Sequence, residues 1–299
     1  SDLTLADNSG NLARDGYTFA GWNTAADGSG GSYAEGATYT ADSDLTLYAE
    51  WTTLPTYTVT YDANGADSGF APAGQTKTHG SNLTLSSNSN DLFREQFKFE
   101  GWNTQPDGSG TSYSEGATYR TDADLTLYAE WADYEIGDTG PAGGVIFYDD
   151  EDEGTADIAG ARYLEAAPDS TEDLHKWGDY GTEIGGDAQL TGIGDGQAAT
   201  DAIVAHMDVE PITGTAAQLA DGLSHGAYTD WFLPSKDELD LMYQNKGTIG
   251  LESRYYWSSS ESSSKYSAED AWLQDFDDGD QLDIAEKKEY YPVRAVRAF

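Results

Sequence analysis

The chain has 299 residues, and its 54 acidic side chains outnumber the 15 basic ones, which gives a formal net charge of −39. A surface this acidic repels nucleic acid and anionic membranes, so the charge argues against partners of both kinds. The sequence contains no cysteine, which excludes disulfides, thiolate catalysis, zinc–thiolate sites and iron–sulfur clusters.

The length suggests two or three domains. Aromatic residues make up 12% of the chain and there are 34 glycines, a composition that favours short strands joined by many turns. No run approaches the roughly 20 apolar residues of a membrane-spanning helix, and no signal peptide opens the chain. Because Ser1–Leu5 resembles the middle of a repeat, we expect a fragment of a longer, extracellular protein.

The first 131 residues contain an internal repeat. Ser1–Trp51 aligns with Ser81–Trp131 without a gap, and Trp22 falls on Trp102. A fixed step of this kind is typical of a modular array. Within Leu45–Trp51 apolar and polar residues alternate, which predicts a strand with one buried face.

A further strand is predicted at Tyr57–Tyr61, ahead of the turn-forming run Asp62–Gly65, and the first copy has no equivalent of it. These motifs, with Gly101–Thr104 and Leu125–Trp131, resemble the Listeria–Bacteroides type repeat, the B-repeat of internalin-like adhesins. The resemblance implies two β-grasp-like modules, a truncated one at residues 1–52 and a complete one at 53–132. We favour a stalk over direct binding, because a small module needs its Trp and Tyr side chains in its core.

A third domain is expected from residue 133 to residue 299. Short apolar strands are predicted at Val145–Tyr148 and Ala161–Ala166. The acidic run Asp149–Gly154 between them departs from the spacing of an EF-hand loop. We interpret it as a solvated hairpin tip, with a metal loop as the alternative.

Three helices follow these strands. Apolar spacing predicts the first two at Thr200–Met207 and Ala216–Leu223. The third begins with a capping box, in which Ser235 and Glu238 each satisfy a backbone N–H of the first turn. We expect this helix to end at Gly247.

Strands dominate the rest of the chain. They are predicted at Tyr255–Ser259, Ala271–Phe276, Gln281–Ala285 and Val293–Phe299, with an Asp-Asp-Gly-Asp turn between the second and the third. Helices first and strands last predict an α+β domain with a mainly antiparallel sheet.

Four motifs of this domain, Gly140–Tyr148, Asp230–Tyr243, Tyr256–Glu261 and Val293–Arg297, resemble the DUF1566 domain, which is similar to the C-terminal domain of the Legionella collagen-like adhesin. The resemblance implies a C-type-lectin-like fold, related in shape to formylglycine-generating enzymes and to the variable proteins of diversity-generating retroelements. It also implies a ligand face built from the C-terminal strands and loops. Some such relatives bind sulfated polysaccharides, but here the net charge argues against an anionic glycan.

Candidate ligand-binding residues are chosen for side chains that antibody loops favour, and for the cations near the C-terminus. They are Ser262, Lys265, Tyr266, Trp272, Gln274, Lys287, Lys288 and Tyr290. Trp272 and Gln274 project from one face of their strand, and whether Trp272 belongs to the core or to the ligand face stays open.

The remaining aromatic and cationic side chains of these motifs are assigned structural roles. Trp231 and Trp257 are expected in the core, and Arg294 and Arg297 in buried or half-buried ion pairs that hold the last strand. Lys287 and Lys288 are expected to be exposed. Dense carboxylates at Asp275, Asp277, Asp278 and Asp280 predict a weak Ca²⁺ site, with a solvated turn as the alternative.

No catalytic constellation stands out. Gly222–Gly226 matches Gly-x-Ser-x-Gly, but it follows a helical stretch, so a hydrolase using Ser224 is a distant alternative. The glycine-rich run Gly192–Gly196 has no preceding strand and no P-loop lysine. The four histidines, at positions 79, 175, 206 and 225, are not at metal-ligand spacing.

We therefore expect a non-enzymatic ligand-binding tip of a bacterial cell-surface adhesin, which binds a glycan or a protein on another cell surface and has no cofactor except Ca²⁺. An oligomer is compatible with the sequence. The alternative is a variable binding protein of a diversity-generating retroelement, which only the coding DNA can reveal.

Overall fold

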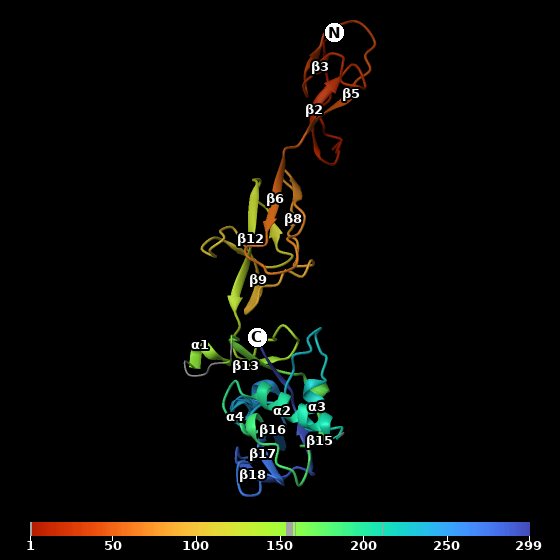
Figure 1. Ribbon diagram of the computed structural model, residues 1–299. Helices are drawn as coiled ribbons and strands as arrows, with labels where there is room; N and C mark the ends of the chain where they lie inside the picture. Colours follow the sequence, from red (N-terminus) through yellow and green to blue (C-terminus); the bar gives the residue numbers. More distant parts are fainter. Residues whose placement is uncertain (1, 154–157, 159, 211) are drawn as a thin grey trace. The chain divides into compact units, whose positions relative to one another are not determined.

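The computed structural model describes residues 2–153, 158, 160–210 and 212–299. The chain forms two compact units, described here one at a time (Figure 1). The N-terminal unit comprises Ser1–Phe93 and Phe99–Trp131, and the C-terminal unit comprises Arg94–Lys98 and Ala132–Phe299. Regular structure is mostly β with few helices, as the composition predicted. Among the described residues, no helix has the length and apolar character needed to cross a membrane.

The first copy of the repeat is a small antiparallel sheet. Its strands are β3 (Ser32–Tyr33), β2 (Tyr17–Asn23) and β5 (Tyr48–Thr53), in that order, and a separate pair joins β1 (Leu3–Thr4) to β4 (Thr38–Tyr39). The Phe19 ring meets the rings of Trp22 and Trp51 edge-on, at centroid distances of 5.2 and 5.6 Å. This aromatic group is the centre of the module.

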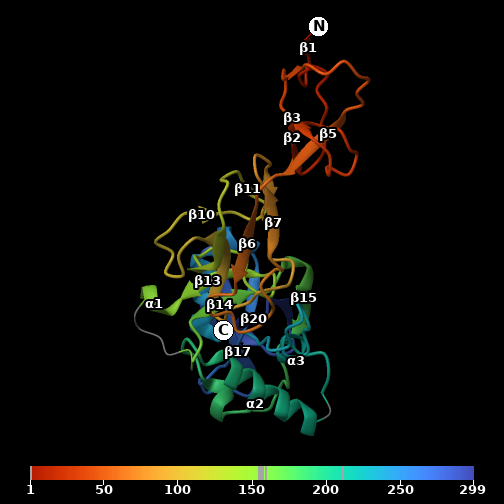
Figure 2. The same cartoon turned by 90° about the horizontal axis from the view of Figure 1, so that it is seen from above.

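The second copy builds a larger sheet because it has the extra strands. The order is β10 (Ser112–Tyr113), β9 (Phe97–Asn103), β12 (Leu125–Asp133), β6 (Thr56–Asp62) and β7 (Gln75–Thr78), and β8 (Leu83–Thr84) pairs with β11 (Thr118–Tyr119). Strands β12 and β6 run parallel, whereas β6 and β7, side by side in Figure 2, are antiparallel. The predicted strand at Tyr57–Tyr61 is confirmed.

Equivalent tryptophans differ in burial between the copies. Trp102 is fully buried, whereas Trp22 is only half-buried. Both contact a phenylalanine edge-on, but Trp102 is also covered by the Tyr61 ring of β6, 4.7 Å away between centroids. The added strand therefore closes the core of the second copy.

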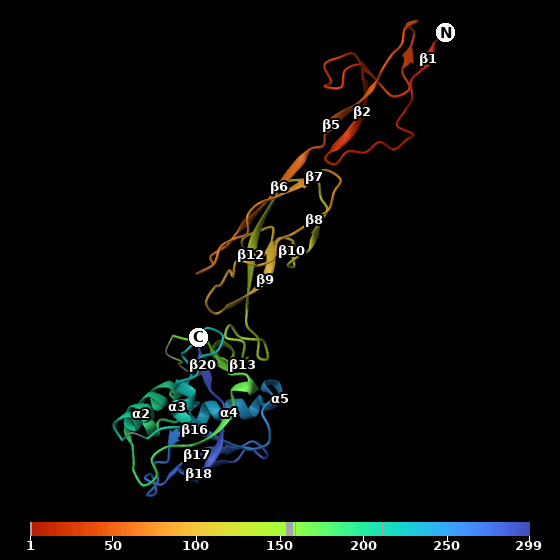
Figure 3. The same ribbon diagram turned by 90° about the vertical axis from the view of Figure 1, so that its right-hand side faces the viewer.

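The C-terminal unit combines helices with three small sheets (Figure 3). Its helices are α1 (Asp150–Glu153), α2 (Gly196–Val209), α3 (Ala216–Asp221), α4 (Lys236–Gln244) and α5 (Lys246–Ile249). Its strands are β13 (Val145–Asp149), β14 (Tyr163–Ala166), β15 (Asp173–Lys176), β16 (Tyr255–Glu261), β17 (Asp270–Asp275), β18 (Gln281–Glu286), β19 (Tyr290–Val293) and β20 (Val296–Ala298). They form three sheets, with the strand orders β13-β14-β20, β15-β19 and β16-β17-β18. Within the described residues, the pairs that these strands form are antiparallel.

Three local predictions are confirmed or corrected here. The capping box of Ser235 and Glu238 opens α4 as predicted. The end at Gly247 is wrong, because α5 contains that residue and the left-handed Gly250 (φ 72°) ends the helical segment. The single strand Val293–Phe299 is also wrong: β19 pairs with β15 and β20 pairs with β14, so the chain changes partner at Arg294.

The acidic run after β13 differs from the predicted hairpin tip. Asp149 is buried and accepts hydrogen bonds from both Nε and Nη2 of Arg162, at 2.8 and 3.0 Å. The next four residues form the short helix α1. Gly154, the last residue of the predicted run, lies outside the described residues.

Candidate functional site

The structure divides the eight candidate ligand-binding residues into three groups. Lys265, Tyr266, Lys288 and Tyr290 are exposed, and Trp272 is half-buried. Ser262, Gln274 and Lys287 are buried, so their prediction as ligand contacts is wrong.

Lys287 was expected to be exposed, but it forms an ion pair inside the unit. Its Nζ lies 2.5 Å from Oε1 of Glu261, and neither side chain is exposed. The same ammonium donates to the Thr182 carbonyl at 2.8 Å and lies 5.0 Å from the centre of the Trp177 ring. Burial lowers the pKa of Lys287, and the Glu261 carboxylate opposes that effect.

Gln274 is covered because helix α4 packs on its strand. Its Nε2 donates to Oδ1 of Asp240, on α4, at 2.8 Å and to the Gly279 carbonyl at 3.2 Å. Trp272, two residues earlier, keeps part of its ring exposed, with Nζ of Lys236 5.3 Å from the ring centre. Trp272 therefore belongs neither wholly to the core nor wholly to the exposed face.

Exposed tyrosines and lysines lie on two neighbouring loops, which hold Tyr180 and Tyr266, and on the turn between β18 and β19, which holds Lys288. Lys288 Nζ lies 4.2 Å from the Tyr180 ring centre, and Tyr180 Oη donates to Glu286 at 3.4 Å. On the other loop, Lys265 Nζ lies 4.6 Å from the Tyr266 ring centre. The loops are joined because Gly181 N donates to the Ala268 carbonyl at 2.7 Å. We call Tyr180, Lys265, Tyr266 and Lys288 the tyrosine–lysine surface.

The buried ion pair of Lys287 and Glu261 fixes the segment that carries Tyr180. The Glu261 carboxylate accepts from the backbone N–H groups of Ile184 (2.8 Å) and Gly185 (2.6 Å), just after Tyr180 in the chain. Trp177 N donates to the Lys287 carbonyl at 2.9 Å, just before it. The segment that carries Tyr180 is therefore held at both ends.

Tyr180 is the functional candidate that the sequence did not reveal. It lies in a polar loop with no family motif of its own, far from Tyr266 along the chain. Only the fold brings the two loops together.

The two arginines near the C-terminus are buried and form the expected ion pairs, with acidic partners that range from buried to exposed. Arg294 donates to Asp169 and to Glu172, at 2.7 Å in both cases. Arg297 binds Asp230 through Nε and Nη2, at 3.0 and 2.8 Å, and also donates to the buried Glu165 at 3.3 Å. Trp231 and Trp257 are buried, which confirms their assignment to the core.

Glu238 gives this unit a pH dependence. Burial raises the pKa of its carboxyl to about 7, against the lowering effect of N–H donors from Ser235, Gly194 and Gly196. A rise from the ordinary 4.5 to about 7 corresponds to roughly 3 kcal/mol. Since the folded form binds this proton more tightly than the unfolded form, the stabilisation is complete below pH 4.5 and is lost as the pH rises through 7.

We therefore expect the free energy of unfolding to fall between pH 5 and 8 by roughly 2.5 kcal/mol more in the parent protein than in a Glu238→Gln variant. Urea titrations at several pH values measure the difference. Asp237→Asn, a change at the preceding helix position, is the control and should keep the parent profile. Superimposable profiles for the parent and Glu238→Gln would contradict the assignment.

The predicted metal-binding residues and the candidate catalytic serine lie at two loops of this unit. Asp275 and Asp278 accept from the backbone N–H groups of Asp277 and Asp280, at 2.8 and 3.0 Å, as in a self-contained turn. Within the described ranges, no group of three or more potential ligand side chains is found, and Ca²⁺ binding stays a prediction. Ser224 is exposed in the loop after α3, not on a strand-to-helix turn.

Comparison with known proteins finds similarity to two proteins of Evansella cellulosilytica. A putative Gly-rich membrane protein is 39% identical over 135 residues, and a putative membrane protein is 43% identical over 90 residues. The matches cover 43% and 30% of this chain, but only 15% and 13% of the relatives. The chain thus corresponds to a small part of each.

Among solved structures, a fimbrial protein from Bacteroides ovatus aligns over 89% of this chain and 77% of its own, with a TM-score of 0.39 and 12% identity. That likeness is too weak to define a fold. The family comparison is more specific, and it confirms the resemblance of the N-terminal part: residues 2–50 and 57–130 each match the model of the Listeria-Bacteroides repeat domain.

Proposed function

We propose that the chain belongs to a bacterial cell-surface adhesin, in which the two β-grasp-like repeats serve as a stalk. The C-terminal unit is its C-type-lectin-like head and acts by binding, without catalysis. The tyrosine–lysine surface is its contact with a glycan or a protein on another cell.

The repeats support the cell-surface location. Their family match covers residues 2–50 and 57–130, and both relatives are named as membrane proteins. Their aromatic residues lie toward the module centres, where Trp102 is fully buried and the Phe99 ring meets it edge-on at 5.2 Å. Side chains used for packing in this way favour a stalk.

One observation carries the binding proposal: exposed aromatic side chains stand on loops that are fixed by buried contacts. Tyr266 is 51% exposed and Tyr180 is 39% exposed, although the segment of Tyr180 is tied to the buried Glu261 and Lys287. Tyrosine offers a large, rigid contact area. Fixing the loop in advance reduces the ordering cost on binding.

Charge narrows the range of ligands. At a net charge of −39, long-range repulsion slows the approach of a strongly anionic polymer. Lys265 and Lys288 supply positive charge only locally, each beside a tyrosine ring. A neutral glycan or a protein with a neutral or basic surface fits this pattern best.

The test applies the whole chain to glycan arrays and to arrays of cell-surface proteins. For any ligand found, we expect Tyr180→Ala with Tyr266→Ala to weaken binding at least about 30-fold, since truncation of two anchor residues costs 2 kcal/mol or more. The melting temperature should change little, because both side chains are exposed.

Tyr255→Ala is the matched control. This tyrosine is 41% exposed and belongs to the same unit. It lies at the first residue of β16, at the opposite end of that strand from Glu261, whose carboxylate holds the segment of Tyr180. Binding should survive its removal. An absence of ligands on both arrays, or equal losses in the control and the double variant, would refute the proposed role of the surface.

A further inference from the structure

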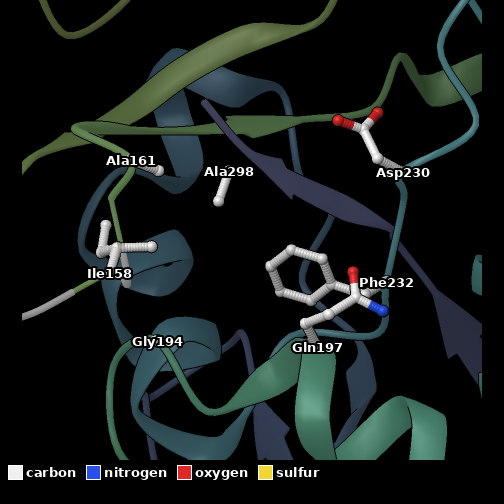
Figure 4. Close-up of a pocket in the computed structure, with 7 residues that line it drawn as sticks. All are labelled: Ile158, Ala161, Gly194, Gln197, Asp230, Phe232 and Ala298. Carbon is white, nitrogen blue, oxygen red and sulfur yellow. The ribbon is translucent and has the colours of Figure 1, made fainter.

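The C-terminal unit also contains a cavity formed by other residues. Its volume is about 240 Å³. Figure 4 shows Ile158 and Ala161 on one side, and the Phe232 ring with Gln197 and Asp230 on the other. Ala298 of β20 also lines it. The cavity thus has an apolar wall and two polar side chains.

Asp230 is held in place before any ligand arrives. Both of its oxygens bind the Arg297 guanidinium, at 3.0 and 2.8 Å, and Arg297 is itself fixed by the buried Glu165. The Asp230 side chain is nevertheless half-exposed, so its remaining lone pairs can accept hydrogen bonds. Because Arg297 already balances its charge, a second cation gains little at this position.

Gln197 supplies the other polar group. It lies in the first turn of α2, and its Nε2 donates to Oδ1 of Asp201 at 2.8 Å, which fixes the orientation of the amide. Oε1 is then left to accept from a ligand. The Asp230 carboxylate and Gln197 Oε1 are therefore both hydrogen-bond acceptors, which suits a ligand that has hydrogen-bond donors and no net charge.

The size of the cavity limits the ligand to one ring. Pockets for drug-sized ligands span roughly 300–1,000 Å³, and this one is smaller, at about 240 Å³. A sugar ring combines hydroxyl donors on its edge with an apolar C–H face. Such a face suits a wall made by Phe232, Ile158 and two alanines.

We propose that this cavity is a second binding site, which takes the terminal sugar of a neutral glycan. The hydroxyls donate to Asp230 and Gln197, and the C–H face lies against Phe232. This site is independent of the tyrosine–lysine surface and does not require that surface to bind anything.

The experiment is saturation-transfer difference NMR on the full chain. The probes are the methyl glycosides of glucose, galactose, mannose and fucose, with butylammonium as a cationic probe of similar size. We expect transfer to at least one glycoside. Gln197→Ala should weaken its binding by up to about tenfold, the value of one neutral hydrogen bond. Ala298→Leu should abolish it by filling the cavity.

Gln244→Ala is the matched control, because Gln244 also donates from a helix to an aspartate one turn away, Asp240, outside the cavity. It should bind like the parent, and so should Tyr180→Ala with Tyr266→Ala. Melting curves verify that the two cavity variants are folded. Three results would overturn the proposal: no saturation transfer to any of the four glycosides, glycoside binding that persists in Ala298→Leu, or saturation transfer to butylammonium but to none of the glycosides.

Discussion

Replacing Glu261 with alanine is expected to lower the free energy of unfolding of the C-terminal unit by about 3–5 kcal/mol, because a buried charge loses its partner. Lys287 would keep the Thr182 carbonyl and the Trp177 ring as close neighbours, and Asp179 and Glu183 would act on its charge from a longer distance. The N–H groups of Ile184 and Gly185 would lose their acceptor as well. Chemical denaturation of the full chain, followed by tryptophan fluorescence, measures the loss.

Glu286→Ala provides the comparison, since this carboxylate pairs at 2.9 Å with Lys288 and both side chains are substantially exposed. Exposed pairs contribute about 1 kcal/mol or less. Replacing Glu261 and Lys287 together by methionine should recover only the part of the loss that comes from the unpaired ammonium, because both charges are removed. The N–H groups of Ile184 and Gly185 still lack their acceptor in that variant. A cost for Glu261→Ala as small as that for Glu286→Ala would show that the pair adds little.

Trp102→Ala is expected to destabilise the second repeat by about 3–5 kcal/mol, the range for truncating a large buried aromatic side chain. The change removes ring contacts with Tyr61 and Phe99 and the hydrogen bond from Nε1 to the Ser86 carbonyl, 2.9 Å long. Hydrogen exchange followed by mass spectrometry can locate the loss within the full chain, in peptides from β9 and β12.

The internal repeat supplies the control for this change. Trp22→Ala removes the equivalent side chain, with its own hydrogen bond from Nε1 to the Ala6 carbonyl at 2.7 Å. Because Trp22 is half-buried and has no counterpart of Tyr61, it should cost less. Equal effects in the two copies would mean that the strand β6 does not determine how tightly the module packs.

Features that depend on near neighbours in the chain could be predicted from the sequence. The capping box of Ser235 and Glu238 needs residues three apart, and it is present as predicted. The strand at Tyr57–Tyr61 depends on a local alternation of side chains, and it is also present. The family match of the repeats agrees with the motifs that were quoted for them.

Features that depend on partners far away in the chain could not be predicted from the sequence. Lysine is usually a surface residue, but Lys287 is buried. It forms an ion pair with Glu261 and donates to the Thr182 carbonyl, and these partners lie on two other segments of the chain. Gln274 shares a strand face with the half-buried Trp272, yet helix α4 covers it through Asp240. Tyr180 joins the candidate surface only because its loop is bonded to Ala268.

The parallel pairing of β6 with β12 has a mechanical consequence for a chain held under tension. The register runs from Val59 opposite Leu125 to Asp62 opposite Tyr128. Pulling on the chain ends would draw β6 by its first residue and β12 by its last, in opposite directions along their length. The ladder is then loaded in shear, so its bonds must break together instead of one after another. Such an arrangement resists force better than a hairpin peeled open from one end.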